Sequence, residues 1–196
     1  MTVQLDADVA TVLEADPWMA ELVATHGPVS VTPAEHPFEQ LVVSVVNQSI
    51  STAAARSIRE DLFSVFEEPI SPAAVLDADR DELAAIVGGQ KAEYIRNVAS
   101  AYERGEISPD RLTDATEQEV IDALTEIRGV GRWTADMYLL FVLGRDDVFP
   151  IGDLGVRRGM VAVYGEMSRD EMVEKARNWE PYRSYATKYL WLEYES

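Results

Sequence analysis

Residues 124–136 carry a turn whose residue types suit the binding of an anion. Gly129 and Gly131 flank Val130, between one helix expected to end at Ile127 and another expected to begin just after the turn. Glycine permits positive φ angles and lets the backbone approach a bulky ligand closely. The free N–H groups and the dipole at the start of a helix favour a phosphate group. On the two glycines alone, an ordinary helical hairpin with a glycine turn explains the pattern equally well.

Two polar side chains near this turn could add to phosphate binding. Arg132 supplies a positive charge, and the hydroxyl of Thr134 can donate a further hydrogen bond. Contacts of this kind, made to phosphate through the backbone and nearby side chains, do not depend on base sequence.

A carboxylate follows twenty residues after Trp133. The segment Phe149-Pro150-Ile151-Gly152 leads to Asp153, which stands where another helix is expected to start. An aspartate in that position is commonly an N-cap that only stabilises its helix. The alternative is a chemical role for Asp153, because a loop that contains proline and glycine leads to it after a phosphate-binding turn.

Nearly every segment around these residues has the pattern of a short helix. Proline or a capping residue precedes most of the apolar repeats, and glycine ends several of them. Thr116 with Glu119, and Ser168 with Glu171, have the spacing of capping boxes. The sequence predicts an all-α fold, in which the helices include 18–25, 38–50, 53–66, 91–102, 133–143, 154–164 and a last one after Pro181.

The charge of the chain is unusual for a protein that would bind phosphates. The 196 residues include 35 acidic and 17 basic ones, which gives a net charge of −18. Strong salt screening weakens repulsion between like charges, so a high-salt cytoplasm would favour such a surface with few lysines. Residues 128–158 contain five arginines and four acidic residues, a net charge of +1 in an otherwise acidic chain. The alternative is an acidic protein that does not bind DNA or any other chain of phosphates.

Several kinds of site are excluded or not expected. The chain has no cysteine, so it lacks disulfides, thiolate zinc sites and cysteine-ligated iron–sulfur clusters. Nothing in the sequence places its two histidines near each other, and we expect no cofactor. No apolar run is long enough to cross a membrane, and no signal peptide is recognisable at the N-terminus. We therefore expect no contact with a membrane.

The hairpin with its aspartate resembles the helix-hairpin-helix–Gly/Pro–Asp superfamily of DNA glycosylases and, within it, the DNA-3-methyladenine glycosylase II family. Weaker similarities follow in family order, including residues 37–41, 47–51, 89–92 and 179–191. The resemblance implies two helical lobes with the active-site cleft between them. We expect residues 1–36 and 154–196 in one lobe, and residues 37–153 in the other, with the helix-hairpin-helix at about 118–143.

The resemblance implies a role for Asp153 and for a base pocket. Asp153 would face the sugar of a nucleotide flipped out of the duplex and stabilise the positive charge that develops as the base leaves. Trp133 stands where bifunctional relatives carry a lysine nucleophile, so we expect base removal without strand cleavage. Trp133 would line the base pocket, where its indole favours a cationic base. Alternatively, it is a core aromatic that packs the two helices of the hairpin together. Met137 and Gln48 would line the same pocket.

The resemblance also implies DNA contacts at Ser49 and Ile50, in addition to Gly129, Val130, Gly131, Arg132 and Thr134. One residue of this loop would fill the gap left by the flipped base, and Ser49 holds that position with Ile50 beside it. Alternatively, Gln48 and Ser51 merely end one helix and cap the next. The carbonyl groups of Thr125, Ile127 and Val130 would hold a monovalent cation in the DNA-bound state.

The prediction is thus a monomeric, monofunctional glycosylase that excises alkylated purines such as 3-methyladenine from double-stranded DNA during base excision repair. We expect it in the cytoplasm, associated with the nucleoid, at high salt. Two alternatives stay open: a glycosylase for another lesion, such as hypoxanthine or an oxidised base, and a non-catalytic DNA-binding protein that uses the hairpin alone.

Overall fold

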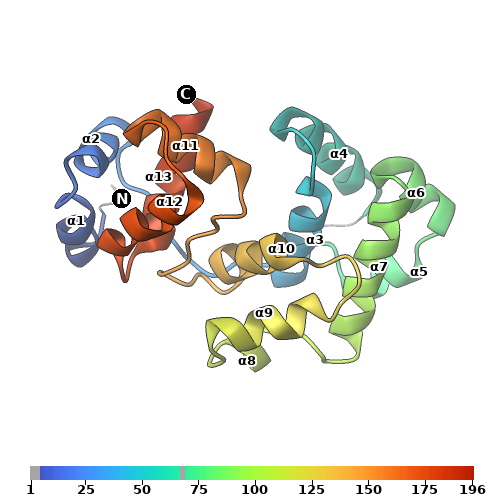
Figure 1. Ribbon diagram of the computed structural model, residues 1–196. Helices are drawn as coiled ribbons and strands as arrows, with labels where there is room; N and C mark the ends of the chain where they lie inside the picture. Colours follow the sequence, from blue (N-terminus) through green and yellow to red (C-terminus); the bar gives the residue numbers. More distant parts are fainter. Residues whose placement is uncertain (1–4, 67–68) are drawn as a thin grey trace. The chain divides into compact units, whose positions relative to one another are not determined.

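Helices make up the architecture of the chain, which a computed structural model describes over residues 5–66 and 69–196. No strand occurs among these residues, which confirms the predicted all-α class. They form two compact units (Figure 1). We call residues 5–32 with 144–196 the terminal unit, and residues 33–143 the central unit. No helix of the described chain is long and apolar enough to span a bilayer.

The terminal unit gathers both ends of the chain around one apolar core. Its buried side chains include Leu13, Met160, Trp179 and Leu190. The glycine-bearing helix α11 and the last helix α13 pack against each other along their length. The helices of the unit are α1 (Ala7–Leu13), α2 (Pro17–His26), α11 (Leu154–Tyr164), α12 (Arg169–Ala176), the 3-10 turn η2 (Arg177–Trp179) and α13 (Arg183–Glu195).

A buried ionic cluster closes one side of this core. Asp16 caps α2 by accepting a hydrogen bond from the N–H of Trp18 at 3.1 Å. Its other oxygen lies 2.7 Å from Lys175 Nζ and accepts a hydrogen bond from the Tyr164 hydroxyl at 3.0 Å. Burial alone would raise the pKa of Asp16, but the bonds from Lys175 and Tyr164 outweigh it and lower that pKa. The carboxylate therefore stays charged inside the fold.

The central unit is built around α3, whose side chains at Leu41, Val42, Val45 and Val46 are fully buried. This helix packs against α4, α7 and α10 (Figure 1). The helices of the unit are α3 (Pro37–Asn47), α4 (Thr52–Val65), α5 (Pro72–Asp77), α6 (Arg80–Val87), α7 (Gly89–Glu103), α8 (Pro109–Leu112), α9 (Glu117–Thr125), α10 (Arg132–Met137) and the π-helical turn η1 (Tyr138–Val142).

The limits of the two units lie near those expected for the lobes but differ in detail. Residues 33–36 belong to the central unit and residues 144–153 to the terminal unit; residues 1–4 lie outside the described chain. The second difference has a local cause. Ser184, at the start of α13, accepts a hydrogen bond from the N–H of Val148 and donates one to the carbonyl of Arg145. Arg183 pairs with Asp147 at 2.6 Å. These bonds attach the loop that leads to Asp153 to the terminal unit.

Candidate functional site

A tight turn joins α9 to α10 and gives the hairpin its shape. The N–H of Val130 donates to the carbonyl of Ile127 at 2.9 Å, which closes the turn. Gly129 has a φ of 101°, and a Cβ built on it would lie 2.1 Å from the ring of Tyr94. Only glycine satisfies both conditions, because another residue would be strained in φ and would collide with that ring.

Gly131 differs from Gly129 because the space around it is open. It is the N-cap of α10, it is exposed, and a Cβ built on it would meet no atom within 4 Å. No side chain caps the first turn of α10. An anion can therefore approach the N–H groups at the start of this helix, as the sequence predicts for a phosphate.

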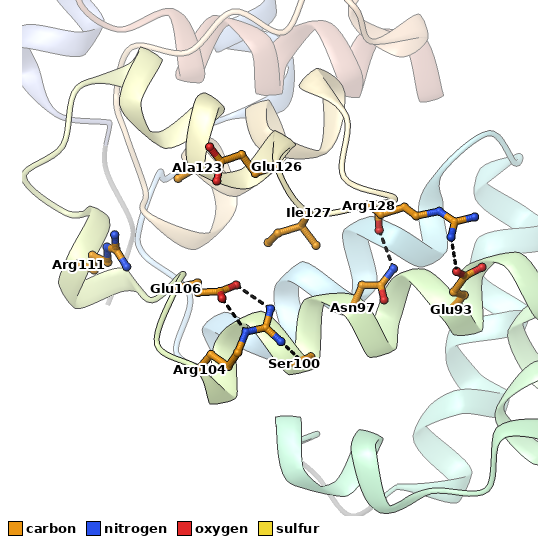
Figure 2. Close-up of a pocket in the computed structure, with 10 residues that line it drawn as sticks. All are labelled: Glu93, Asn97, Ser100, Arg104, Glu106, Arg111, Ala123, Glu126, Ile127 and Arg128. Carbon is orange, nitrogen blue, oxygen red and sulfur yellow. Dashed lines mark hydrogen bonds and ion pairs between the residues drawn. The ribbon is translucent and has the colours of Figure 1, made fainter.

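Carboxylates already pair with the two arginines of the hairpin. Arg132 donates from Nε to Asp136 at 2.7 Å and from Nη2 to Glu117 at 3.1 Å. Burial raises the pKa of Asp136, although its hydrogen bond with Arg132 opposes that rise. Arg128 pairs with Glu93 at 2.8 Å (Figure 2). The guanidinium groups of both arginines are therefore already paired with carboxylates.

A cavity lies beside the hairpin, on the side of α7 (Figure 2), and has a volume of about 550 Å³. The polar groups that line it are bonded to one another: Arg104 pairs with Glu106 at 2.6 Å, and Asn97 donates to the carbonyl of Arg128. Of the predicted site residues, only Ile127 is among its lining residues. This cavity is therefore not the predicted base pocket.

The remaining predicted residues of α10 differ in exposure. Trp133, its second residue, is half-buried, whereas Thr134 and Met137 are buried. The Thr134 hydroxyl accepts a hydrogen bond from the side-chain amide of Gln48 at 2.9 Å. Tyr138, which follows α10, is fully buried. Val130 is also buried in the turn, and the carbonyls of Thr125, Ile127 and Val130 all belong to this hairpin.

The loop after α3 lies beside the hairpin turn. The helix ends at Asn47, so Ile50 lies outside it, although the sequence predicts helix to about that residue. Ser49 is exposed with a φ of 55°, and Ile50 is partly buried. Ser51 caps α4 by accepting from the N–H of Ala54, so this part of the alternative reading of the segment is confirmed.

Asp153 belongs to the terminal unit, where a braced loop presents it. Its N–H donates to the carbonyl of Pro150 at 2.8 Å, which forms a turn. Arg157 donates from Nη1 to the carbonyls of Ile151 at 2.9 Å and Gly152 at 2.6 Å. Asp153 is the N-cap of α11, and its Oδ1 accepts from the N–H of Val156 at 2.8 Å. The carboxylate is half-buried.

Trp191 is a residue that sequence reasoning missed. Its indole N–H donates to Oδ1 of Asp153 at 2.8 Å. A Cβ on Gly155 would lie 2.8 Å from Cδ1 of this indole, and one on Gly159 would lie 2.3 Å from the carbonyl oxygen of Leu190. Glycines four residues apart on α11 were the available signal, because they allow another helix to approach closely.

No group of three or more histidine, aspartate or glutamate side chains in the described part of the chain could hold a metal ion. The predicted site residues provide a capped carboxylate with an indole donor in the terminal unit, and an open helix start with a neighbouring loop in the central unit.

Comparison with known proteins relates this chain to DNA repair proteins. Residues 42–183 match the family described as HhH-GPD superfamily base excision DNA repair protein. The alkylbase DNA glycosidase-like protein mag2 of Schizosaccharomyces pombe is 32% identical over 182 residues, which cover 88% of this chain and 85% of that protein. The DNA-3-methyladenine glycosylase of Bacillus subtilis is 30% identical, and the match covers 79% of this chain but 56% of that longer protein.

Among solved structures, the 3-methyladenine DNA glycosylase Mag1 of Schizosaccharomyces pombe, in complex with abasic DNA, superposes with a TM-score of 0.85. It is 27% identical in sequence, and the match covers 94% of this chain and 95% of that one.

Proposed function

Because this chain belongs to the HhH-GPD superfamily of base excision DNA repair proteins, we propose that it is a monofunctional DNA N-glycosylase that excises alkylated purines such as 3-methyladenine. The observation that carries the proposal is the Asp153 carboxylate, which a braced loop, a helix start and the Trp191 indole hold in one orientation. A residue that only capped its helix would not need the second donor.

Asp153 acts in this proposal by stabilising charge. As the bond between the sugar and the base breaks, its electron pair leaves with the base and positive charge develops on the sugar. The ionised carboxylate stabilises that charge, and a water molecule then bonds to the sugar carbon and gives up a proton. An alkylated purine is already cationic, so it leaves as a neutral base without a separate proton donor.

Trp133 determines that the reaction stops at base removal. An indole has no amine that could form a Schiff base with the sugar, so strand cleavage does not follow. Its π face favours a cationic base by roughly 0.5–2 kcal/mol, which suits alkylated purines over neutral bases. Met137 belongs to the same base pocket in this proposal.

The partner is double-stranded DNA with damaged bases, bound by a monomer. The phosphate backbone meets the N–H groups at the start of α10, and Ser49 and Ile50 contact the DNA beside the lesion. A monovalent cation on the hairpin carbonyls of Thr125, Ile127 and Val130 accompanies DNA binding. The net charge of −18 fits a nucleoid-associated protein of a high-salt cytoplasm.

The test is the release of bases from matched duplexes that contain methylated purines, hypoxanthine or no lesion. We expect release from the methylated duplex, with an abasic strand that stays intact until alkali is added. Release of hypoxanthine alone would assign another lesion to the site. Binding to abasic DNA without any release would leave the non-catalytic alternative, and strand cleavage without alkali would contradict the assignment of Trp133.

A further inference from the structure

The side chain of Gln48 connects two segments that the sequence keeps far apart. Its amide nitrogen donates to the carbonyl of Gly129 at 3.0 Å and to the hydroxyl of Thr134 at 2.9 Å. Gly129 belongs to the hairpin turn and Thr134 to the first turn of α10. Both hydrogens of the amide are therefore used inside the protein.

The residues just before Gln48 are held as well. Lys91, on α7, donates from Nζ to the carbonyl of Val46 at 2.6 Å. Arg59, on α4, donates to the side-chain oxygen of Asn47 at 2.8 Å. Residues 46–48 thus each have a bond from a different helix or to the hairpin, and the end of α3 is fixed before the exposed loop begins.

Ser49 follows directly in a conformation that a serine rarely adopts. Its φ of 55° lies in the left-handed region, and its side chain is exposed. Such a conformation is strained for a residue with a side chain and persists only where the surrounding structure holds it. Gln48, the residue directly before Ser49, is held by its two bonds to the hairpin.

We propose that Gln48 is a positioning residue that holds loop 47–51 against the hairpin turn, so that both segments meet DNA as one preformed surface. The inference rests on the proposed function only in naming DNA as the partner. In this proposal Gln48 acts through the hairpin and not as a donor in the base pocket, because both hydrogens of its amide are engaged by Gly129 and Thr134. A preformed loop lowers the entropy lost on binding.

The experiment compares Gln48→Met, which keeps the length of the side chain but removes its donors, with Thr134→Val, which removes one acceptor. Gln118→Met serves as a matched control, because Gln118 is exposed on α9 and bonds only to Asp122 in the described contacts. Thr134→Ser keeps the hydroxyl that accepts from Gln48 and should recover most of the affinity lost in Thr134→Val. Affinity is measured with an abasic duplex, and the rate of base release at saturating DNA.

We expect Gln48→Met to weaken DNA binding about tenfold, with a much smaller change in the rate at saturation, since the loop must then be ordered on binding. The effects of Gln48→Met and Thr134→Val should be non-additive, because the two side chains share one bond. Equal affinity of Gln48→Met and the unmodified protein, or fully additive effects, would overturn the proposal.

A measurement without DNA separates this inference from the proposed function. The backbone N–H of residue 48 donates to the carbonyl of Val45 at 3.3 Å, and its exchange should become about tenfold faster in Gln48→Met and remain unchanged in Gln118→Met. Unchanged exchange at this amide would refute the positioning role even if the protein binds DNA and releases bases as proposed. Faster exchange in a protein that releases no base would support the role of Gln48 and reject the glycosylase assignment.

Discussion

Trp191 donates its indole N–H to the carboxylate oxygen of Asp153 that also caps α11, although 38 residues separate the two in the chain. One oxygen thus accepts two hydrogen bonds, each at 2.8 Å. Hydrogen bonds to an ionised acceptor are stronger than neutral ones and restrict its rotation. The orientation of the carboxylate therefore depends on α13 as well as on the loop that precedes it.

Asp153→Asn should abolish most of the activity while leaving the fold intact. Asparagine caps a helix about as well as aspartate, so the melting temperature should change little. Loss of the negative charge should slow base release by about 100-fold or more. Single-turnover release from a methylated duplex measures this, and DNA affinity should be kept or improved. Asp170→Asn, at an exposed acid of α12, is the control. Unchanged release would remove Asp153 from the mechanism.

Trp191→Phe removes the indole donor but keeps an aromatic ring. We expect the turnover rate to fall about tenfold, because a hydrogen bond to a charged group is lost. The KM for the methylated duplex should change less than the turnover rate, since the substitution acts on the carboxylate. Trp18→Phe provides the comparison, because Trp18 is 54% exposed on α2. A Trp191→Phe protein with the same rate as the Trp18→Phe protein would show that the indole does not matter.

The two glycines of the hairpin should respond differently to alanine. Gly129→Ala places a methyl group against the ring of Tyr94 at a φ of 101°, so it should destabilise the fold by about 1–3 kcal/mol. Gly131→Ala meets no atom within 4 Å and should leave stability nearly unchanged. Its methyl group would nevertheless stand at the open start of α10 and weaken DNA binding about tenfold. Denaturant titrations and affinity for an abasic duplex distinguish the two effects. Gly131→Ala binding as tightly as the unmodified protein would argue against phosphate contact there.

The buried Asp16 predicts an acid-dependent loss of stability. Its pKa in the fold lies below the usual value of an aspartate, so the unfolded chain binds more protons than the fold does at acidic pH. The stabilisation is complete above the unfolded pKa and is lost as the pH falls through the folded pKa. Asp16→Asn should cost about 1–3 kcal/mol at neutral pH, because Lys175 loses its charged partner. Melting curves of both proteins from pH 7 to about pH 2 should converge at the acid end; a constant difference would contradict this.

Salt should stabilise the protein if its charge reflects a high-salt habitat. Screening reduces the repulsion among the 35 acidic residues, so the melting temperature should rise from dilute buffer to molar potassium chloride. Chloride is preferable to sulfate, which stabilises most proteins through exclusion from their surface. Greatest stability in dilute buffer would end the high-salt interpretation.

Local patterns in the sequence predicted the helices well. The capping boxes at Thr116 with Glu119 and at Ser168 with Glu171 are both present, because each depends only on residues three positions apart. The start of α2 behind Asp16 and Pro17 is confirmed for the same reason. Signals of this kind are complete within one turn of helix.

Features that depend on distant residues were not predictable. The helix α3 ends at Asn47, and the next residue, Gln48, is bonded to the distant hairpin turn. The π-helical turn after Met137 has no local signature in the sequence. The bond of Trp191 to Asp153 depends on how α11 and α13 approach each other. For Gln48 and for Trp191, the partner that decides the local structure lies far away in the chain.

The contact of Gly159 with the backbone of Leu190 bears on any attempt to change the range of excised bases by mutagenesis. A side chain at position 155 or 159 would separate α11 from α13 and draw the Trp191 indole away from the carboxylate. A combinatorial library should therefore keep both glycines constant and place its diversity at Trp133 and Met137, which line the base pocket in the proposed function. Variants selected in that way would differ in the bases that they excise, while the Asp153 carboxylate keeps its position in all of them.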